Sequence, residues 1–344
     1  MKKTVLTLAL ALAAAFISFA QQNVQDAAAE AAKAIAEAPQ ELSQAPKPSN
    51  WTDVLVLDFG FNQTELTNWA AGGFNNLNLN AGLDAKADYA KDLASWGNRL
   101  QLQYGILWSE DKEDLIQRST DRIYLESKFS YRTSKDSKWS YSVDFDFRSQ
   151  FSNGYTYNKP AEGQTWTEAA TLKSGFLSPA YTNLGLGMYW APNALFNINL
   201  SPFTGGLTFV RIPDLRYTYG MDLLSKYAEV EEKAADTPGS HFRYTKFQLG
   251  ALIKTNVKFN INDKFGYETQ LVLFSDYLNR PWVPRVNWDN KITWQIAKYF
   301  KLGLNTWLIY DPNVMITDNS GNTATRVQIK EFLTFSFTWK TGNK

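Results

Sequence analysis

The sequence predicts an all-β protein, a transmembrane antiparallel up-and-down β-barrel of about twelve strands, within a range of roughly ten to fourteen. From about Val54 to Lys340, apolar and polar residues alternate in recurring stretches, as in strands with one apolar and one polar face. The connections between these stretches alternate between short and long, and a secretory leader precedes them. These three features together are typical of a barrel in the bacterial outer membrane.

The alternation itself places each predicted strand. From Leu77 to Tyr89, apolar residues hold the odd positions and mostly Asn, Asp or Lys the even ones, whereas a helix would scatter them around its circumference. The seventh strand is weaker, because Pro202 and the glycines at 205 and 206 indicate a bulge or an early loop. In chain order, the predicted strands are Val54–Gln63, Phe74–Tyr89, Asn98–Ser109, Asp121–Arg132, Trp139–Gln150, Tyr181–Trp190, Phe196–Phe209, Phe242–Ile261, Phe265–Asp276, Val286–Ala297, Phe300–Tyr310 and Arg326–Lys340.

The connections fit the rule that outer-membrane barrels have long outer loops and tight periplasmic turns. The short connections are Ala90–Gly97, Thr133–Lys138, Ala191–Leu195, Asn262–Lys264 and Lys298–Tyr299. The longer connections are Thr64–Gly73, Glu110–Thr120, Phe151–Ala180, Val210–His241, Tyr277–Arg285 and Asp311–Thr325. An even number of strands then leaves both ends of the barrel segment in the periplasm.

Two segments precede the barrel, which is expected to occupy residues 51–344. Residues 1–20 read as a signal peptide, with a basic start, an apolar core and cleavage before Gln21. An uncleaved membrane anchor is the alternative, but the apolar stretch is shorter than the roughly twenty residues that a spanning helix needs. Residues 21–50 are rich in Ala and Pro, which predicts a helical or disordered periplasmic linker, or else a helix that plugs the lumen.

Composition excludes several classes of function. With no cysteine in 344 residues, the chain has no disulfide, thiolate metal site or cysteine nucleophile. No Walker loop, HExxH motif or paired metal spacing occurs, so neither a metal site nor a cofactor is expected. The net charge of +1, or about −1 without Lys2 and Lys3 (+1 − 2), gives no reason to expect nucleic acid as a partner. Aromatic residues make up 15%, which suits barrel girdles but also an aromatic-rich soluble sandwich.

The inward faces of the strands carry the charged residues that could act on a solute. Their two signs are interleaved, whereas a channel selective by charge would favour one sign. This interleaving fits a polar solute path, and it fits equally a partly closed interior in which cross-barrel ion pairs satisfy buried charges. The lumen-lining candidates are Asp84, Lys86, Asp88, Arg99, Glu126, Lys128, Asp144, Asp146, Arg148, Lys254, Glu268, Lys291 and Lys330.

Catalytic residues are scarce. The one histidine is His241, at the edge of the longest predicted loop, with Ser240 beside it. A barrel phospholipase needs a serine and a histidine on the lipid-facing wall, and neighbouring strand residues point to opposite faces. We therefore expect no catalytic residues, and an outer-membrane acyl hydrolase remains a distant alternative.

Five segments carry a resemblance to a known family. They are TNWAAGG at Thr67–Gly73, WGNRLQLQYG from Trp96, DRIYLESKFSYR from Asp121, WSYSVDFDF from Trp139 and SQFSNGYTY from Ser149. Their order resembles an outer-membrane β-barrel family of Bacteroidota that is catalogued as a domain of unknown function. The resemblance spans roughly Trp51 to the C-terminus, implies a barrel in the outer membrane, and brings no catalytic residues.

The NWAAGG element would lie in the first outer loop. Trp69, Gly72 and Gly73 would form an outer-loop signature there, with Trp69 as an aromatic anchor and the glycines permitting a tight bend. The same three residues could instead form a contact for a lipid or a partner.

Two classes of function remain for such a barrel. The first is a non-enzymatic envelope component that lets polar solutes pass, and the second is a structural or assembly subunit whose filled barrel docks other envelope proteins. The expected partners are outer-membrane lipid, lipopolysaccharide and the barrel-assembly machinery, whose recognition signal the final FLTFSFTWK segment resembles in part. Other envelope proteins are expected partners of the second class.

Overall fold

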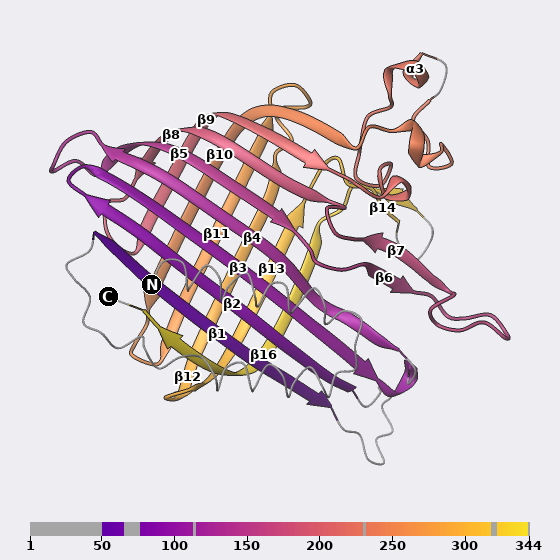
Figure 1. Ribbon diagram of the computed structural model, residues 1–344, viewed down its shortest axis with the longest axis horizontal. Coiled ribbons are helices and arrows are strands. Elements are labelled where there is room, and N and C mark those ends of the chain that lie inside the picture. Colours follow the sequence, from indigo (N-terminus) through magenta and orange to yellow (C-terminus); the bar gives the residue numbers. More distant parts are fainter. Residues whose placement is uncertain (1–49, 65–75, 113–114, 230–231, 318–321, 343–344) are drawn as a thin grey trace. The chain divides into compact units, whose positions relative to one another are not determined.

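The alternating stretches form twelve long strands that close into a barrel, shown in Figure 1. The computed structural model describes residues 50–64, 76–112, 115–229, 232–317 and 322–342. The barrel strands are β1 (Trp51–Thr64), β2 (Asn76–Lys91), β3 (Ala94–Ser109), β4 (Ile116–Arg132), β5 (Trp139–Ser149), β8 (Ala180–Trp190), β9 (Phe196–Phe209), β10 (Thr245–Asn260), β11 (Phe265–Asp276), β12 (Arg285–Ala297), β13 (Phe300–Tyr310) and β16 (Gln328–Thr341). The predicted fold class is therefore confirmed.

Every barrel strand pairs with its neighbours in sequence, and β1 pairs with β16 to close the sheet. The closing register runs antiparallel from Leu55 opposite Thr341 to Phe61 opposite Phe335. Closure gives both edges of every strand a hydrogen-bonding partner, so the sheet has no open edge. Within the described ranges, no helix has the length and apolar content needed to cross a bilayer.

The two ends of the barrel differ in their connections, as the sequence predicted. At one end, which we call the short-turn end, residues 92–93, 133–138, 191–195, 261–264 and 298–299 join the strands. Asp92 has a φ of +53°, and the side chains of Asn193 and Asn262 accept backbone hydrogen bonds inside their turns. The other end, the long-loop end, carries the longer connections.

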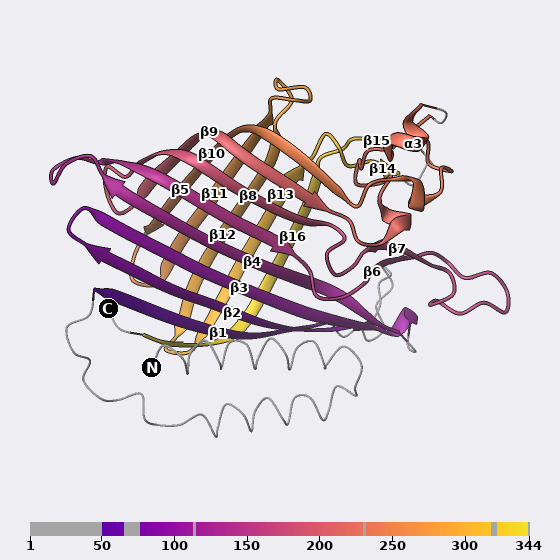
Figure 2. The same cartoon turned by 45° about the horizontal axis from the view of Figure 1, so that its top comes forward.

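The long loops contain elements that the alternation did not predict. They are the 3-10 helix η2 (Glu110–Lys112), the strand pair β6 (Gly154–Tyr157) and β7 (Ala170–Ser174), η3 (Pro213–Leu215), α3 (Ser225–Ala228), η4 (Gly239–His241), and the strand pair β14 (Ile316–Thr317) and β15 (Thr323–Ala324). Figure 2 shows β6, β7, α3, β14 and β15 gathered at the same end of the barrel.

Four predicted strand starts were wrong by three residues or more. Strand β1 begins at Trp51 and not at Val54, and strand β3 begins at Ala94 and not at Asn98. Strand β4 begins at Ile116 and not at Asp121, because a register shift opposite Gly105 and Ile106 interrupts the alternation that the prediction followed. Strand β10 begins at Thr245 and not at Phe242, since the Phe242 side chain is only 1% exposed and packs in a loop core.

The irregularity expected in the seventh strand is a bulge, and the strand continues beyond it. Leu200 to Phe203 of β9 lie opposite Met188 to Leu186 of β8, so β9 carries one extra residue. The register with β10 shifts at the same place. Pro202 has no N–H to donate to the ladder, and a bulge is a position within a sheet where such a residue is tolerated.

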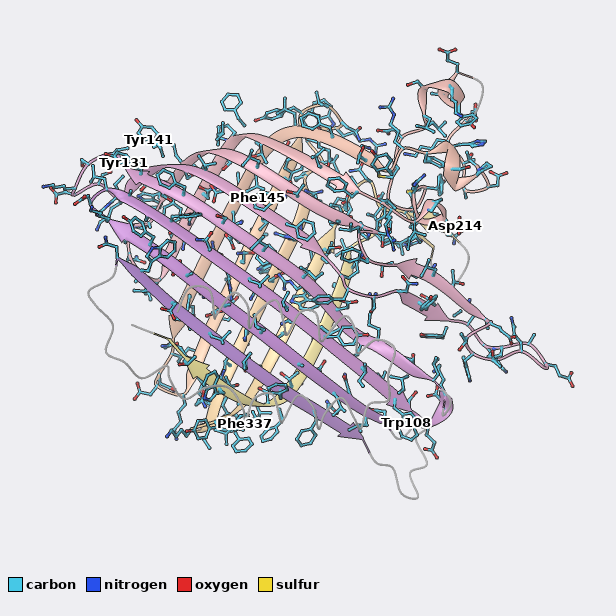
Figure 3. All side chains as sticks on the ribbon, viewed as in Figure 1. Trp108, Tyr131, Tyr141, Phe145, Asp214 and Phe337 are labelled. Atoms are coloured by element: carbon cyan, nitrogen blue, oxygen red, sulfur yellow. The ribbon has the colours of Figure 1, made fainter. Side chains whose placement is uncertain are left out.

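Apolar side chains cover the outer face of the barrel, including aromatic residues at the short-turn end. Each barrel strand contributes one residue to this aromatic girdle, often stacked on its neighbour: Trp139 lies 5.8 Å from Trp190 and Phe265 lies 5.4 Å from Trp294, measured between ring centroids. Figure 3 shows Tyr131 and Tyr141 close to the same end, and Trp108 near the opposite end. The girdle comprises Trp51, Tyr89, Trp96, Phe129, Trp139, Trp190, Phe196, Phe259, Phe265, Trp294, Phe300 and Phe337.

Candidate functional site

The inward side chains divide the lumen into two polar cavities. The short-turn cavity has a volume of about 740 Å³ and reaches the turns at Asp263 and Lys298. The long-loop cavity has a volume of about 420 Å³ and reaches loop residues such as Tyr219 and Val314. No residue lines both cavities. A layer of inward side chains, which we call the belt, comprises Arg122, Tyr124, Glu126, Arg148, Lys254 and Asp289. Tyr124, Glu126 and Lys254 line neither cavity, and the other three line the long-loop cavity.

A buried ion pair forms the centre of the belt. The Nζ atom of Lys254 on β10 lies 3.0 Å from Oε1 of Glu126 on β4, although three strands separate β4 from β10 along the sheet. The Tyr124 hydroxyl donates to Oε2 of the same carboxylate at 3.1 Å. The side chains of Lys254 and Glu126 are 3% and 17% exposed. Both partners of the pair are thus largely withdrawn from water, so each charge depends on the other for compensation.

A second ion pair crosses the full width of the lumen. Nη2 of Arg122 on β4 lies 3.0 Å from Oδ2 of Asp289 on β12, and five strands separate β4 from β12 in either direction. The guanidinium groups of Arg122 and Arg148 lie 5.2 and 5.0 Å from the Tyr124 ring centroid. The belt therefore ties opposite walls together around one aromatic ring.

Polar groups also fill the wall beside the belt. The Asn199 amide donates to Asp144 at 2.7 Å, and the Asn183 amide donates to Asp146 at 3.1 Å. On the other side, Nζ of Lys330 donates to the Ser119 carbonyl oxygen at 2.7 Å. These contacts supply inward charges with polar partners.

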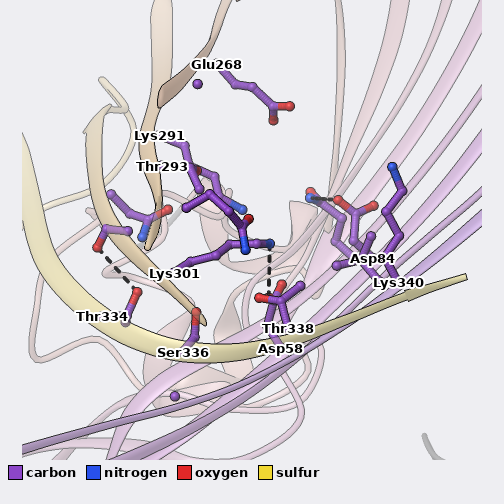
Figure 4. A pocket seen from close by; sticks show the side chains of 18 of the residues that line it. Asp58, Asp84, Glu268, Lys291, Thr293, Lys301, Thr334, Ser336, Thr338 and Lys340 are labelled. Carbon is purple, nitrogen blue, oxygen red and sulfur yellow. Dashed lines mark hydrogen bonds and ion pairs between the residues drawn. The ribbon is translucent and has the colours of Figure 1, made fainter. Parts of the chain in front are cut away.

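The short-turn cavity is basic. Its acidic side chains are Asp58, Asp84, Asp263 and Glu268, and its basic side chains are Lys86, Arg99, Lys258, Lys264, Lys291, Lys298, Lys301 and Lys340. Eight positive charges against four negative charges leave a formal excess of four. Figure 4 shows Lys291 and Lys301 on one side of this cavity and Asp84 and Lys340 on the other.

The long-loop cavity is balanced in charge and covered by folded loops. It contains three arginines, Arg122, Arg148 and Arg285, and three aspartates, Asp121, Asp289 and Asp311. Asp121 at the loop end of β4 accepts hydrogen bonds from the backbone N–H groups of residues 151 and 152 at 2.7 and 2.8 Å. The β5–β8 loop is thereby fixed to the barrel wall.

The cover has a small core of its own. Val210, Leu215, Met221 and Phe242 are buried together in the β9–β10 loop. The Tyr219 hydroxyl donates to the Lys173 carbonyl oxygen at 2.9 Å and links this loop to β7. Burial raises the pKa of Tyr219 to about 12, so its hydroxyl keeps its proton at neutral pH and remains a donor.

The predicted lumen residues are spread over the two cavities, the belt and the wall. Asp84, Lys86, Arg99, Glu268 and Lys291 line the short-turn cavity, and Arg148 lines the long-loop cavity. Glu126 and Lys254 form the central pair of the belt. Asp144, Asp146 and Lys330 bond within the filled wall, and Nζ of Lys128 lies 3.5 Å from the Tyr189 ring centroid. Asp88 lies near the end of β2, where its backbone oxygen accepts from Thr52 at 3.5 Å.

Sequence reasoning missed three belt residues, Arg122, Tyr124 and Asp289. The alternation could have found them, because they flank the apolar residues Ile123 and Trp288, and the neighbours of an outward-facing strand residue point inward. An aromatic residue such as Tyr124 gives no polar signal, although it occupies the centre of the belt.

The other sequence candidates are His241 and the three residues of the outer-loop signature. The His241 ring stacks on Tyr227, with 3.7 Å between centroids, in the loop before β10. Trp69, Gly72 and Gly73 of the outer-loop signature lie outside the described residues. In the part of the chain that the structure describes, no group of three His, Cys, Asp or Glu side chains could hold a metal ion.

A family model described as "Protein of unknown function (DUF3078)" matches residues 61–155. This match supports the expected likeness to a domain of unknown function over that segment. No curated protein matches this chain.

Solved structures with a similar course of the chain include three outer-membrane barrels. The translocator domain of the autotransporter NalP from Neisseria meningitidis is 10% identical, with 91% of this chain and 95% of that chain covered and a TM-score of 0.36. An outer membrane channel from Pseudomonas putida F1 is 10% identical, with 88% and 99% covered and a TM-score of 0.37. Outer membrane phospholipase A from Escherichia coli is 9% identical, with 86% and 94% covered and a TM-score of 0.32. Scores this low say nothing about what this chain binds or does.

Proposed function

We propose that this protein is a non-enzymatic outer-membrane barrel through which small polar solutes pass when the belt opens. The aromatic girdle and the apolar outer face support this location, because membrane barrels place aromatic residues where lipid meets water. Closure of the sheet supports it too, since an unpaired strand edge is too costly in lipid. By the loop rule, the short-turn end faces the periplasm.

One observation carries the proposal of passage. Two cavities enter the barrel from opposite ends without sharing a lining residue, and the belt residues Arg122, Arg148 and Asp289 form part of the inner wall of the long-loop cavity. A barrel that served only as a rigid support would have no need of about 740 Å³ of polar space inside its wall. The belt consists of side chains alone, so rotamer changes in a few residues would join the two cavities.

Conductance across planar bilayers tests this proposal. We expect the wild-type protein to stay mostly closed, and the double variant Arg122→Ala/Tyr124→Ala to conduct several-fold more, because it removes the side chains that span the lumen. The matched control is Arg280→Ala/Tyr244→Ala, which truncates the same residue types at exposed positions outside the lumen. This control should conduct like the wild type.

The contradicting result is also defined. If the belt variant retains its β-sheet circular dichroism but conducts no more than the wild type, the lumen is not a passage. If conductance rose equally in the belt variant and in the control, the increase would reflect general destabilisation of the barrel, and the belt would not be the barrier.

A structural or assembly subunit is the second candidate function. The near-complete burial of Lys254 and Tyr124 favours it, since a filled interior stiffens a barrel that docks other proteins. Two results together would support this candidate: no variant conducts, and envelope proteins co-purify stably with the wild type.

The proposal includes the origin and processing of the chain. We propose a Bacteroidota envelope as its setting, on the resemblance of the motifs alone, and removal of residues 1–20 as a signal peptide. Outer-membrane lipid, lipopolysaccharide and the barrel-assembly machinery are its proposed partners. Mass spectrometry of the protein from an outer-membrane fraction would test the cleavage, with an N-terminus at Gln21 expected.

A further inference from the structure

We propose that the short-turn cavity is a binding site for a small solute that carries two or more phosphoryl groups. This inference rests on the proposed function and deepens it, because it names the class of solute that would enter from the short-turn side. The cavity is large enough for such a solute, since ligand sites in proteins commonly enclose about 300–1,000 Å³.

The first reason is the excess of basic over acidic side chains in the lining of the cavity. Arg99 pairs with Asp84 at 2.9 Å, Lys301 lies 3.6 Å from Asp58, and Lys258 pairs with Glu268. After these pairs are made, Lys86, Lys291 and Lys340 have no carboxylate within 4.0 Å among the described residues. A bound anion would supply the missing counter-charge.

The second reason is the register of the wall. Lys86 on β2 lies directly opposite Arg99 on β3, and opposite residues on neighbouring strands are close enough to repel when they share a charge. Asp84, two residues before Lys86 on the same face of β2, bonds to the Arg99 side chain through both carboxylate oxygens. An arrangement that places two cations side by side is unfavourable unless an anion lies between or above them.

The facing wall repeats the arrangement. Lys258, Glu268 and Lys291 lie in one row across β10, β11 and β12, so a single carboxylate stands between two lysines. The Glu268 carboxylate bonds to Lys258, which leaves the Lys291 ammonium directed at the cavity. Figure 4 shows Lys291 beside Thr293 and near Lys301.

The donors around these cations suit phosphoryl oxygens. Lysine binds phosphate as a point charge, and hydroxyl groups add directional hydrogen bonds. Thr293 on β12 and Ser336 on β16 line the same cavity. The long-loop cavity, by contrast, has equal numbers of arginines and aspartates, so the charge excess is confined to the short-turn side.

Isothermal titration calorimetry with sodium pyrophosphate tests the site on the full chain in a non-ionic detergent at low salt. We expect saturable binding that weakens as sodium chloride is raised. The double variant Lys86→Gln/Lys291→Gln should bind about tenfold more weakly or worse. The control Lys159→Gln/Lys226→Gln removes the same charge from exposed loop positions and should bind like the wild type.

Two further variants keep the outcome clear if the double variant fails to fold. Lys340→Gln alone should weaken binding several-fold, and Lys86→Arg should preserve it because the charge is kept. Absence of saturable pyrophosphate binding by the folded wild type, or an equal loss in the control, would overturn the inference. Binding without conductance would instead refute passage while leaving the site intact, so the two failures are distinguishable.

Discussion

At the scale of residues, the ion pair between Lys254 and Glu126 is the most constrained contact in the lumen. Either charge alone would lack a counter-charge in a water-poor interior. Lys254 is 2% exposed, and the Glu126 carboxylate accepts a hydrogen bond from the Tyr124 hydroxyl. Removing one partner of a buried pair is far more damaging than replacing both, since the remaining charge keeps its desolvation penalty. Comparing a variant that removes one partner with a variant that replaces both therefore tests whether the two charges act as a pair.

We expect Glu126→Gln to lower the free energy of unfolding by about 3–5 kcal/mol, because it leaves Lys254 buried without a counter-charge. The double variant Glu126→Gln/Lys254→Met should regain most of that loss. Urea unfolding of the protein in micelles, followed by tryptophan fluorescence, would measure both. A double variant no more stable than the single one would show that the pair does not act as a unit.

The feature that was hardest to predict from the sequence is which inward side chains contact one another. Alternation placed Glu126 and Lys254 on the inner face, but it could not show that they meet, because they are 128 positions apart and three strands separate them. Which side chains touch across a lumen depends on the register of every intervening strand. The candidates could therefore be named, but the belt and the two cavities could not.

At the scale of elements, strand bounds were predicted more accurately than contacts, because the alternation of apolar and polar residues within a strand is a local pattern. Strands β9, β11 and β13 have their predicted bounds at both ends. The errors lie where something non-local intervenes, as at β4, where a bulge shifts the register, and at Phe242, whose apolar side chain belongs to a loop core. The small sheets β6–β7 and β14–β15 are too short to alternate visibly.

The bulge in β9 predicts an uneven tolerance of its neighbouring glycines. A Cβ atom at Gly187 would lie 1.9 Å from the Leu200 carbonyl oxygen, and one at Gly250 would lie 1.9 Å from that of Ser275. We expect Gly187→Ala and Gly250→Ala each to reduce the yield of folded barrel and the urea midpoint. Gly205→Ala is the control, since its Cβ would meet only the Phe247 ring at 3.7 Å. Equal tolerance of all three would contradict the observed register.

At the scale of the whole molecule, the outer face decides where the protein resides. Apolar side chains such as Leu184 and Leu186 are 53% and 52% exposed in the middle of β8, a degree of exposure that water would disfavour along an entire barrel. The aromatic girdle at the short-turn end marks one boundary of the apolar surface. Lipid contact on this face is the physical assumption on which passage, gating and anion binding all depend.

The absence of cysteine from the sequence permits a direct measurement of that contact. Leu184→Cys on the outer face and Lys159→Cys in the β5–β8 loop would be reconstituted separately into vesicles, with a membrane-impermeant maleimide present on both sides. We predict that Lys159→Cys reacts at least about tenfold faster, because lipid excludes the reagent from the barrel wall. Equal reaction rates in vesicles, with the barrel still folded, would contradict the proposal that this protein spans a membrane.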